Sequence, residues 1–324
     1  MTAMGAAAAA AVGTFGALHP RPALAQCPSC SNPGFFAGRA ALDDGRMRSG
    51  ELRVGFDAAY LRADGLIEGS STTRLTQSLE RSTDTLYQHR LVRLVLWYGV
   101  TERLSVGIVA PYENREMLNR RFPPEGHAGV RRHLNLRGPG DAELTARLAL
   151  GRGGSRWGLG VLTGTVIPIG ETHAATTRSE FETVLQIGAG TFIPILGGDA
   201  RVELGPRGFA GGRVQVRPSL YANGDGFRRG SAALAAASAG FRVGDGAVTA
   251  AAGMELGVRA ADQRGGIDVR NTGGRTLYST ATLALAATSN VTASLTLRIP
   301  VHQNVNGLQL RESATLVAGA IYRR

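Results

Sequence analysis

The stretch Asp141 to Leu150 reads Asp-Ala-Glu-Leu-Thr-Ala-Arg-Leu-Ala-Leu. All its even-numbered positions are apolar, and the first four odd-numbered positions are polar: Asp141, Glu143, Thr145 and Arg147. Successive side chains of a β-strand point to opposite faces, so this stretch predicts a strand with one apolar face and one ionic face.

The same alternation recurs in about ten further segments between Glu51 and the C-terminus, and no apolar run is long enough for a membrane helix. In hydrocarbon, every backbone N–H and C=O must bond to a neighbouring strand, so the sheet has to close. A soluble β-sandwich also alternates, but its core positions favour large side chains over the abundant Ala and Gly of this chain. We therefore predict an all-β fold: a transmembrane, antiparallel, up-and-down β-barrel of about twelve strands in a bacterial outer membrane.

The expected strands cover residues 51–61, 86–98, 103–112, 141–150, 157–167, 182–193, 213–221, 232–243, 247–259, 276–288, 291–301 and 310–322. The facing of 86–98 stays open, because its second half is apolar on both parities. Segment 232–243 is nearly all Ala and could instead be helical by propensity. Glycines at 158, 160 and 164 share one parity and would thin the inner wall.

The connections between these segments alternate between short and long, as expected for periplasmic turns and extracellular loops. Only 196–212 breaks the rule, because it is long where a short turn belongs. Aromatic residues gather at strand ends, as membrane-interface girdles require. Those expected at the periplasmic end are Trp97, Tyr98, Trp157 and Tyr322, and those at the other end are Tyr60, Tyr87 and Tyr112.

The N-terminal region predicts export. An Ala-rich run from Met4 to Leu18 precedes Ala23-Leu24-Ala25, which resembles a signal-peptide cleavage site. We expect a signal peptide at 1–25, a Gly- and Pro-containing periplasmic or plug segment at 26–50, and the barrel at 51–324.

The chain carries a formal net charge of +11, and every basic residue is Arg. The arginines are scattered, without dense runs or interleaved aromatics, which argues against nucleic-acid binding. The phosphates of lipopolysaccharide are a better expected partner, because guanidinium groups match phosphate geometry. The arginines expected to face these phosphates are Arg115, Arg120, Arg121, Arg131, Arg132 and Arg137. The alternative is that they lie in solvated loops without lipid contact.

Several phrases resemble the outer-membrane transporter family associated with meta-pathway phenol degradation. They are Leu94 to Tyr112, the Gly-Pro-Gly-Asp at 138–141, the Ile-Pro-Ile-Gly at 167–170 and the Gly-Ala-Gly-Thr at 188–191. The resemblance implies a barrel that passes small organic compounds and supplies no catalytic residues. In this chain Tyr322 is followed by Arg323 and Arg324, whereas such barrels commonly end in an aromatic residue.

Parity also predicts which ionic side chains line the pore. They are Arg53, Asp57, Arg103, Asp141, Glu143, Arg147, Arg217, Glu255, Arg259, Arg298 and Arg311. Arginine outnumbers acid in this set, so an open pore would favour anions, whereas cross-strand ion pairs would neutralise the excess. A barrel of this size implies a passage that is narrow or plugged.

We expect a channel for passive passage of small solutes, hydrophobic or aromatic ones included. The alternatives are a non-conducting barrel that binds lipid or metal and an outer-membrane hydrolase. We expect no cofactor. Cys27 and Cys30 are expected to form a disulfide, with metal capture as the other reading. The five histidines that follow the expected signal peptide map to expected loops or to the outer end of a strand without ligand spacing, so no metal site is predicted: His89, His127, His133, His173 and His302.

Overall fold

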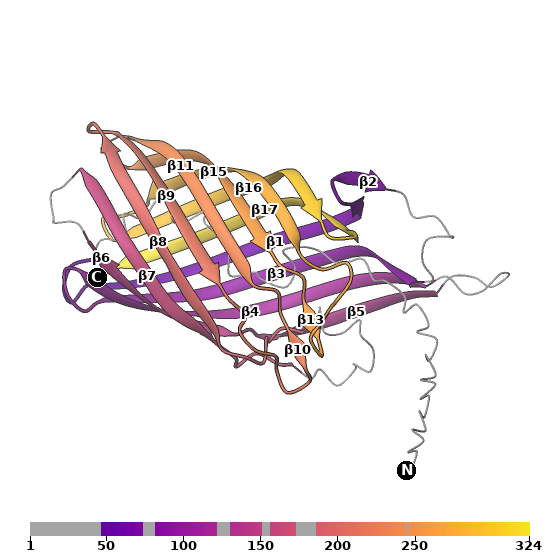
Figure 1. Ribbon diagram of the computed structural model, residues 1–324. Helices are drawn as coiled ribbons and strands as arrows, with labels where there is room; N and C mark the ends of the chain where they lie inside the picture. Colours follow the sequence, from indigo (N-terminus) through magenta and orange to yellow (C-terminus); the bar gives the residue numbers. More distant parts are fainter. Residues whose placement is uncertain (1–46, 74–81, 122–129, 151–155, 173–185, 245) are drawn as a thin grey trace, which may run out of the picture.

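The computed structural model describes residues 47–73, 82–121, 130–150, 156–172, 186–244 and 246–324. Its sheet is an antiparallel barrel of tilted strands (Figure 1). The twelve wall strands are β1 (Leu52–Glu68), β3 (Ser82–Gly99), β4 (Leu104–Arg121), β6 (Ala142–Ala149), β7 (Trp157–Ile167), β8 (Ile193–Leu204), β9 (Gly208–Arg217), β11 (Ala232–Val243), β12 (Val248–Arg259), β15 (Gly274–Ala286), β16 (Val291–Val305) and β17 (Leu308–Arg323).

The barrel closes between its first and last strands. β17 pairs with β1 from Arg53↔Arg323 to Glu68↔Leu308, so neither strand is left as an open edge. Each remaining wall strand pairs with its neighbours in chain order. The predicted closed, antiparallel, twelve-stranded barrel is therefore confirmed.

Five short strands supplement the wall. β5 (Val130–Pro139) pairs with the C-terminal half of β4, nearer the long loops, and β6 pairs with the N-terminal half. Together β5 and β6 form one wall strand that is interrupted near Gly140. β2 (Ser71–Thr73) pairs with the end of β1. A separate small sheet lies at the long-loop end, formed by β10 (Phe227–Arg228), β13 (Gln263–Arg264) and β14 (Ile267–Asp268).

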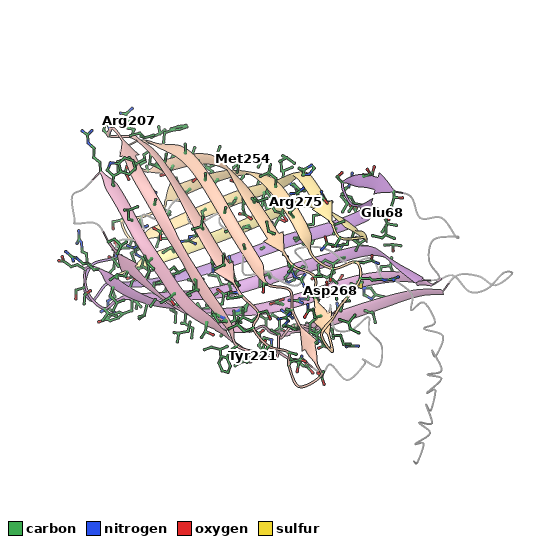
Figure 2. The ribbon with its side chains drawn as sticks, viewed as in Figure 1. Glu68, Arg207, Tyr221, Met254, Asp268 and Arg275 are labelled. Carbon is green, nitrogen blue, oxygen red and sulfur yellow. The ribbon has the colours of Figure 1, made fainter. Side chains whose placement is uncertain are left out.

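The outer surface of the wall is apolar. Leu144, Val214 and Leu283 are each about half exposed, and Met254 projects from the outer face of β12 (Figure 2). Bulky apolar residues on the outside of a closed barrel face lipid, whereas a soluble barrel would bury them. No helix in the part of the chain that the structure describes is long and apolar enough to cross a membrane.

Two strand predictions need correction at β8 and β9. The sixth strand is Ile193–Leu204 rather than 182–193, and β9 begins at Gly208, so the expected long connection 196–212 is largely strand. Only residues 205–207 form the turn, which restores the alternation of short and long connections. The Gly197-Gly198 pair resembles a turn, but a Cβ at Gly197 would lie 2.6 Å from the Val214 carbonyl, so this position in the sheet requires glycine.

The Ala-rich segment 232–243 is a strand, as predicted, and the helical alternative is wrong. β11 pairs along its length with both β9 and β12. These two ladders satisfy the backbone of β11 on both edges, which overrides the helix propensity of Ala.

The aromatic girdles form only in part. Tyr98, Trp157 and Tyr322 are exposed at the short-turn end, and Tyr60 and Tyr112 are exposed nearer the long-loop end. Trp97 and Tyr87 instead point inward, because they lie on the odd-numbered, luminal parity of β3. Their predicted place in the girdles is therefore wrong.

A hydrophobic cluster fills the interior on the β1, β3, β4 and β17 side near the long loops. Its members are Leu61, Ala63, Leu66, Tyr87, Met117, Leu308 and Leu310. A β-bulge makes this possible, because Leu61 pairs with Thr315 whereas Ala63 pairs with Glu312, which leaves an extra residue in β17. The bulge reverses which side chains of β17 face the lumen between Leu308 and Glu312.

Candidate functional site: the barrel lumen

The inner wall carries ion pairs that join neighbouring or nearby strands. Arg93 of β3 donates to both oxygens of the Asp57 carboxylate on β1, at 2.7 and 3.1 Å. Arg147 of β6 binds Asp199 of β8 in the same bidentate way, at 2.9 and 2.7 Å, across the intervening β7. Bidentate pairing fixes each guanidinium in place and neutralises it.

A third pair bridges a wider part of the wall. Arg217 of β9 donates to both oxygens of Glu143 on β6, at 2.8 and 2.9 Å. The two strands are separated by β7 and β8, so this pair reaches across a chord of the lumen. The Arg217 side chain is 5% exposed and that of Glu143 is 14% exposed.

Inward-facing glycines make room for large luminal side chains. A Cβ at Gly160 would lie 2.5 Å from the Arg147 guanidinium, so that group lies flat against β7. A Cβ at Gly107 would likewise lie 2.5 Å from the Trp97 ring. The predicted thinning of the inner wall by glycine therefore serves to seat Arg147 and, on β4, Trp97.

The opposite side of the interior is filled. Arg298 of β16 binds Glu255 of β12 and stacks on the Tyr278 ring, with its Cζ 3.3 Å from the ring centre. The Tyr278 hydroxyl donates to Glu312 at 2.5 Å. The carboxylates of Glu255 and Glu312 are almost fully buried, so this cluster, which we call the buried partition, fills its side of the lumen and leaves no passage there.

The open space therefore runs along the β1 to β9 side of the lumen. A central cavity of about 190 Å³ is lined by the three bidentate pairs and by apolar residues. The apolar part centres on Trp97 and Leu162, and Leu162 packs with Val166 and Ile195. A barrel interior is ordinarily polar, so this patch is an unusual feature of the wall.

At the short-turn end the central cavity faces a wide mouth of about 970 Å³. On β8 and β9, Arg201 stacks on the Phe209 ring at 4.0 Å, and Glu203 accepts hydrogen bonds from Arg201 and Arg242. At the mouth, partial burial acts against ionisation of Glu51. Hydrogen bonds from Arg53 and from the Arg48 backbone outweigh it and hold the pKa of Glu51 below its ordinary value.

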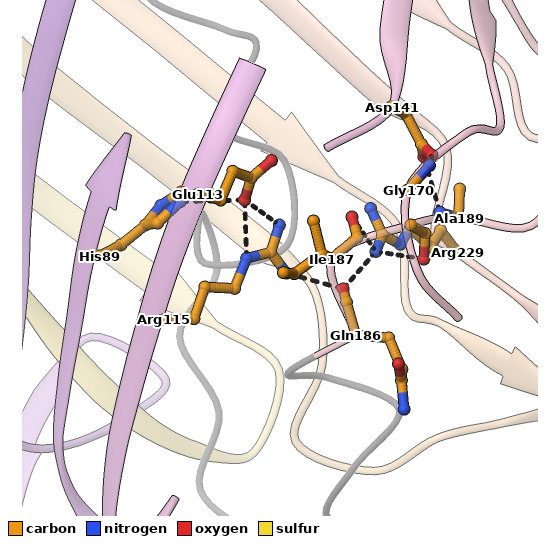
Figure 3. A network of polar contacts seen from close by, with 10 residues as sticks. His89, Glu113, Arg115, Asp141, Gly170, Gln186, Ile187, Ala189 and Arg229 are labelled. Carbon is orange, nitrogen blue, oxygen red and sulfur yellow. Dashed lines mark hydrogen bonds and ion pairs between the residues drawn. The ribbon is translucent and has the colours of Figure 1, made fainter. Parts of the chain in front are cut away.

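At the long-loop end, part of the chain between β7 and β8 lies inside the barrel. This segment is Gln186 to Thr191, and Figure 3 shows its residues Gln186, Ile187 and Ala189 beside Arg229 and Arg115. Arg115 also binds the Glu113 carboxylate, which accepts a hydrogen bond from His89 Nε2 at 3.0 Å. A second cavity of about 50 Å³ adjoins the segment.

The structure places the predicted pore residues in several environments. Those that line the central cavity are Arg53, Asp57, Glu143, Arg147 and Arg217. Asp141 and Arg259 line the smaller cavity, whereas Glu255 and Arg298 belong to the buried partition.

Two predicted pore residues lie elsewhere. Arg103 is exposed in the turn between β3 and β4, at the mouth. Arg311 is exposed on the outer face, because the bulge in β17 turns Glu312 inward instead. Parity counted along an uninterrupted strand could not detect that reversal.

The expected phosphate-facing set also needs a correction. Arg115 is fully buried in the lumen, bound to Glu113, so it cannot face lipid phosphates. Arg137 is exposed on the outer face of β5. The side chains of the other four, Arg120, Arg121, Arg131 and Arg132, lie outside the described residues.

Several luminal residues were missed by the sequence reasoning. Arg93 lies in a segment whose facing the sequence leaves open, although alternate positions from His89 to Trp97 share its parity. Asp199 and Arg201 lie in 196–212, where the sequence analysis expects a connection and the structure has β8. Apolar residues at every second position from Leu196 to Leu204, broken only by Gly198, were the signal that could have identified β8.

Cys27 and Cys30, like His127 and His173, lie outside the described residues. Within the described part of the chain no group of three His, Cys, Asp or Glu could hold a metal ion. His89 is luminal and bound to Glu113, and because β3 begins at Ser82, it lies within the strand and not at the expected outer end.

Comparison with known proteins supports the fold. No family model matches the chain, and no curated protein matches it either. The solved structures that resemble it include an outer membrane channel from Pseudomonas putida F1, with a TM-score of 0.63, 15% identity, and coverage of 86% of this chain and 97% of that one.

A FadL homologue from Pseudomonas aeruginosa gives a TM-score of 0.45 at 9% identity, covering 92% of this chain and 94% of that one. The CymD monoaromatic hydrocarbon channel gives 0.43 at 10% identity, covering 93% and 97%. At these identities the likeness concerns the fold alone. The chain has the fold of a bacterial outer-membrane β-barrel, and its apolar outer surface fits that location.

Proposed function

We propose that this protein is an outer-membrane channel through which small apolar solutes, aromatic ones among them, pass along the β1 to β9 side of the lumen. The observation that carries the proposal is the apolar patch on the inner wall beside the central cavity. Contact between apolar side chains and water is unfavourable. An apolar solute that displaces this water is therefore stabilised at the patch.

The size of the cavity fits such a solute. Its volume is about 190 Å³. An apolar protein cavity of about 150 Å³ is large enough to bind benzene. The Trp97 ring, held flat against Gly107, offers a broad face on which an aromatic solute can stack. A single-ring molecule is therefore the class of solute that we propose, in keeping with the resemblance to transporters associated with phenol degradation.

The charge distribution favours a neutral solute over an anion. The arginines at the central cavity include Arg93, Arg147 and Arg217, and each is held bidentately by a carboxylate. Neutralised pairs produce a weak net field, so the anion preference expected from counting arginines is largely removed. Apolar contact then decides what binds.

The two tryptophans of the chain allow a direct test, because Trp97 lines the lumen and Trp157 is exposed on the outer wall. Trp157→Phe leaves Trp97 as the reporter, and Trp97→Phe leaves Trp157 as the matched control. In proteoliposomes, a brominated phenol should quench Trp97 saturably, and unbrominated phenol should reverse the effect. Quenching of Trp97 that is linear and identical to that of Trp157 would show only partition into lipid and would refute luminal binding.

A second candidate is a non-conducting binding barrel whose lumen is blocked by the N-terminal segment. The observation that favours it is Met47, the first described residue, which is buried and lines both the mouth and the central cavity. Deletion of residues 26–46 separates the candidates. Flux of phenol that appears only after the deletion favours the blocked barrel, and equal flux before and after favours the open channel.

We also propose contact with lipid phosphates on the outer wall. Arg90 of β3 and Arg137 of β5 are exposed and pair in register with Asn114 of β4, which lies between them. Purified Arg90→Gln/Arg137→Gln protein should retain less lipopolysaccharide than wild type. Equal retention would remove this proposal.

A further inference from the structure

Residues Gln186 to Thr191 form an irregular segment inside the barrel. Gln186, Ile187, Ala189 and Thr191 are each at most 7% exposed. Connections between strands ordinarily run over the surface, because irregular backbone buried in protein leaves polar groups that must find partners. The partners of this segment therefore indicate what holds it in the lumen.

One side of the segment is bound by two arginines (Figure 3). Arg229 Nη2 donates to three successive carbonyls, those of Gln186 at 2.7 Å, Ile187 at 3.3 Å and Gly188 at 2.8 Å. Arg115 Nη1 donates to the Gln186 carbonyl at 2.8 Å. Arg115 is fully buried and Arg229 is partly buried, so these bonds are largely shielded from bulk water.

The other side is bound by Asp141, which interrupts the wall between β5 and β6. Its carboxylate accepts from the backbone N–H of Ala189 at 2.6 Å and from that of Gly170 at 2.9 Å. A Cβ at Gly188 would lie 2.2 Å from the Gly170 carbonyl, so this close approach requires glycine. The backbone of the segment is thus fixed by side chains from separate parts of the wall.

The segment lies beside the smaller of two adjoining cavities in the lumen. The cavity beside it has a volume of about 50 Å³, against about 190 Å³ for the central cavity. Arg93, Val109, Glu143 and Arg217 line both cavities, so the two lie end to end. A solute that leaves the long-loop end for the central cavity has to pass Ile187 and Ala189, which line the smaller one.

We propose that Gln186 to Thr191 is the size-selecting constriction of the channel and that Arg229 sets its aperture. This inference rests on the proposed function and deepens it, because the constriction restricts entry to small solutes. Arg229 is a positioning residue: it acts through the three carbonyls that it binds. Its loss frees one side of the segment and widens the passage.

Arg229→Gln tests the proposal, with Arg228→Gln as the matched control. Arg228 is the adjacent residue, but it contacts Ser219 and Gln263 and not the segment. If the two cavities conduct in series in proportion to volume, widening the smaller one to match the larger raises single-channel conductance about twofold. Arg228→Gln should leave the conductance at the wild-type value.

Ala189→Leu provides an independent test that leaves the arginine bonds intact. The larger side chain points into the smaller cavity and should lower the conductance at least as strongly as Arg229→Gln raises it. It keeps the proposal open to refutation even if Arg229→Gln fails to fold.

A conducting wild type with unchanged conductance in folded Arg229→Gln and in Ala189→Leu overturns the constriction and leaves the channel proposal standing. Wild type and variants that all fail to conduct overturn both proposals. A closed wild type that opens on Arg229→Gln supports the constriction while showing that passage is blocked at rest.

Discussion

The Glu143–Arg217 pair allows the luminal account to be tested by the sign of a measured quantity. Both residues line the central cavity and neutralise each other. Arg217→Gln leaves the Glu143 carboxylate uncompensated, which should make the channel prefer cations. Glu143→Gln leaves the Arg217 guanidinium uncompensated, which should make the channel prefer anions.

The size of this effect follows from the cavity. A sphere of about 190 Å³ has a radius of about 3.6 Å, so an ion in it lies about 5 Å from the wall charge. At that distance, with the dielectric constant of water, one unit charge contributes about 0.8 kcal/mol, or about fourfold in local ion concentration. Salt at 0.1 M screens over about 10 Å and leaves most of this contribution.

The assay is the reversal potential across a planar bilayer with a tenfold salt gradient. Relative to wild type, the two variants should shift the reversal potential in opposite directions. Arg90→Gln and Glu116→Gln are matched controls, because this pair has the same chemistry at 3.0 Å but belongs to the outward-facing parity of β3 and β4. Shifts of the same sign in both luminal variants, or shifts no larger than the controls give, would refute the reasoning.

Three further predictions concern stability, each measured by urea titration of folding into vesicles. Gly107→Ala should lower the free energy of unfolding by about 1–3 kcal/mol, because its Cβ meets the Trp97 ring. Gly257→Ala, whose Cβ has no contact under 3.9 Å, should leave the stability nearly unchanged. Equal effects would contradict the seating of Trp97. Leu144→Arg, on the lipid-facing side of β6, should lower the free energy of unfolding by about 2–4 kcal/mol, and Leu285→Arg, near a turn, by about 0–1 kcal/mol. The reverse order would contradict the expected position of the membrane along the barrel. Arg298→Met should cost about 3–5 kcal/mol by leaving Glu255 unpaired, and adding Glu255→Gln should recover part of it. No recovery in the double variant would argue against the ion pair.

The barrel itself was predictable because its signal is local. Alternation in stretches such as Asp141 to Leu150 reflects lipid on one side and a polar interior on the other. Closure follows from backbone hydrogen bonding, which needs no knowledge of which side chains meet. The same reasoning placed Arg53, Asp57, Glu143 and Arg147 on luminal parity.

The contents of the lumen could not be predicted, because they depend on contacts distant in sequence. Arg217 and Glu143 are 74 residues apart, and nothing in either local sequence indicates the other. The bulge that turns Arg311 outward depends on pairing with β1, at the other end of the chain. The buried segment beside Arg229 falls within the expected strand 182–193, because its apolar residues match a barrel wall as well as they match a barrel interior.

In the proposed channel, ions and small apolar solutes pass the same residues of a narrow lumen. The most direct measurement is single-channel current of the refolded wild-type protein in the presence of increasing phenol. We expect discrete current steps that phenol reduces saturably, because a solute in the central cavity obstructs ions. An absence of current steps, or steps that phenol leaves unchanged up to its solubility, would contradict it.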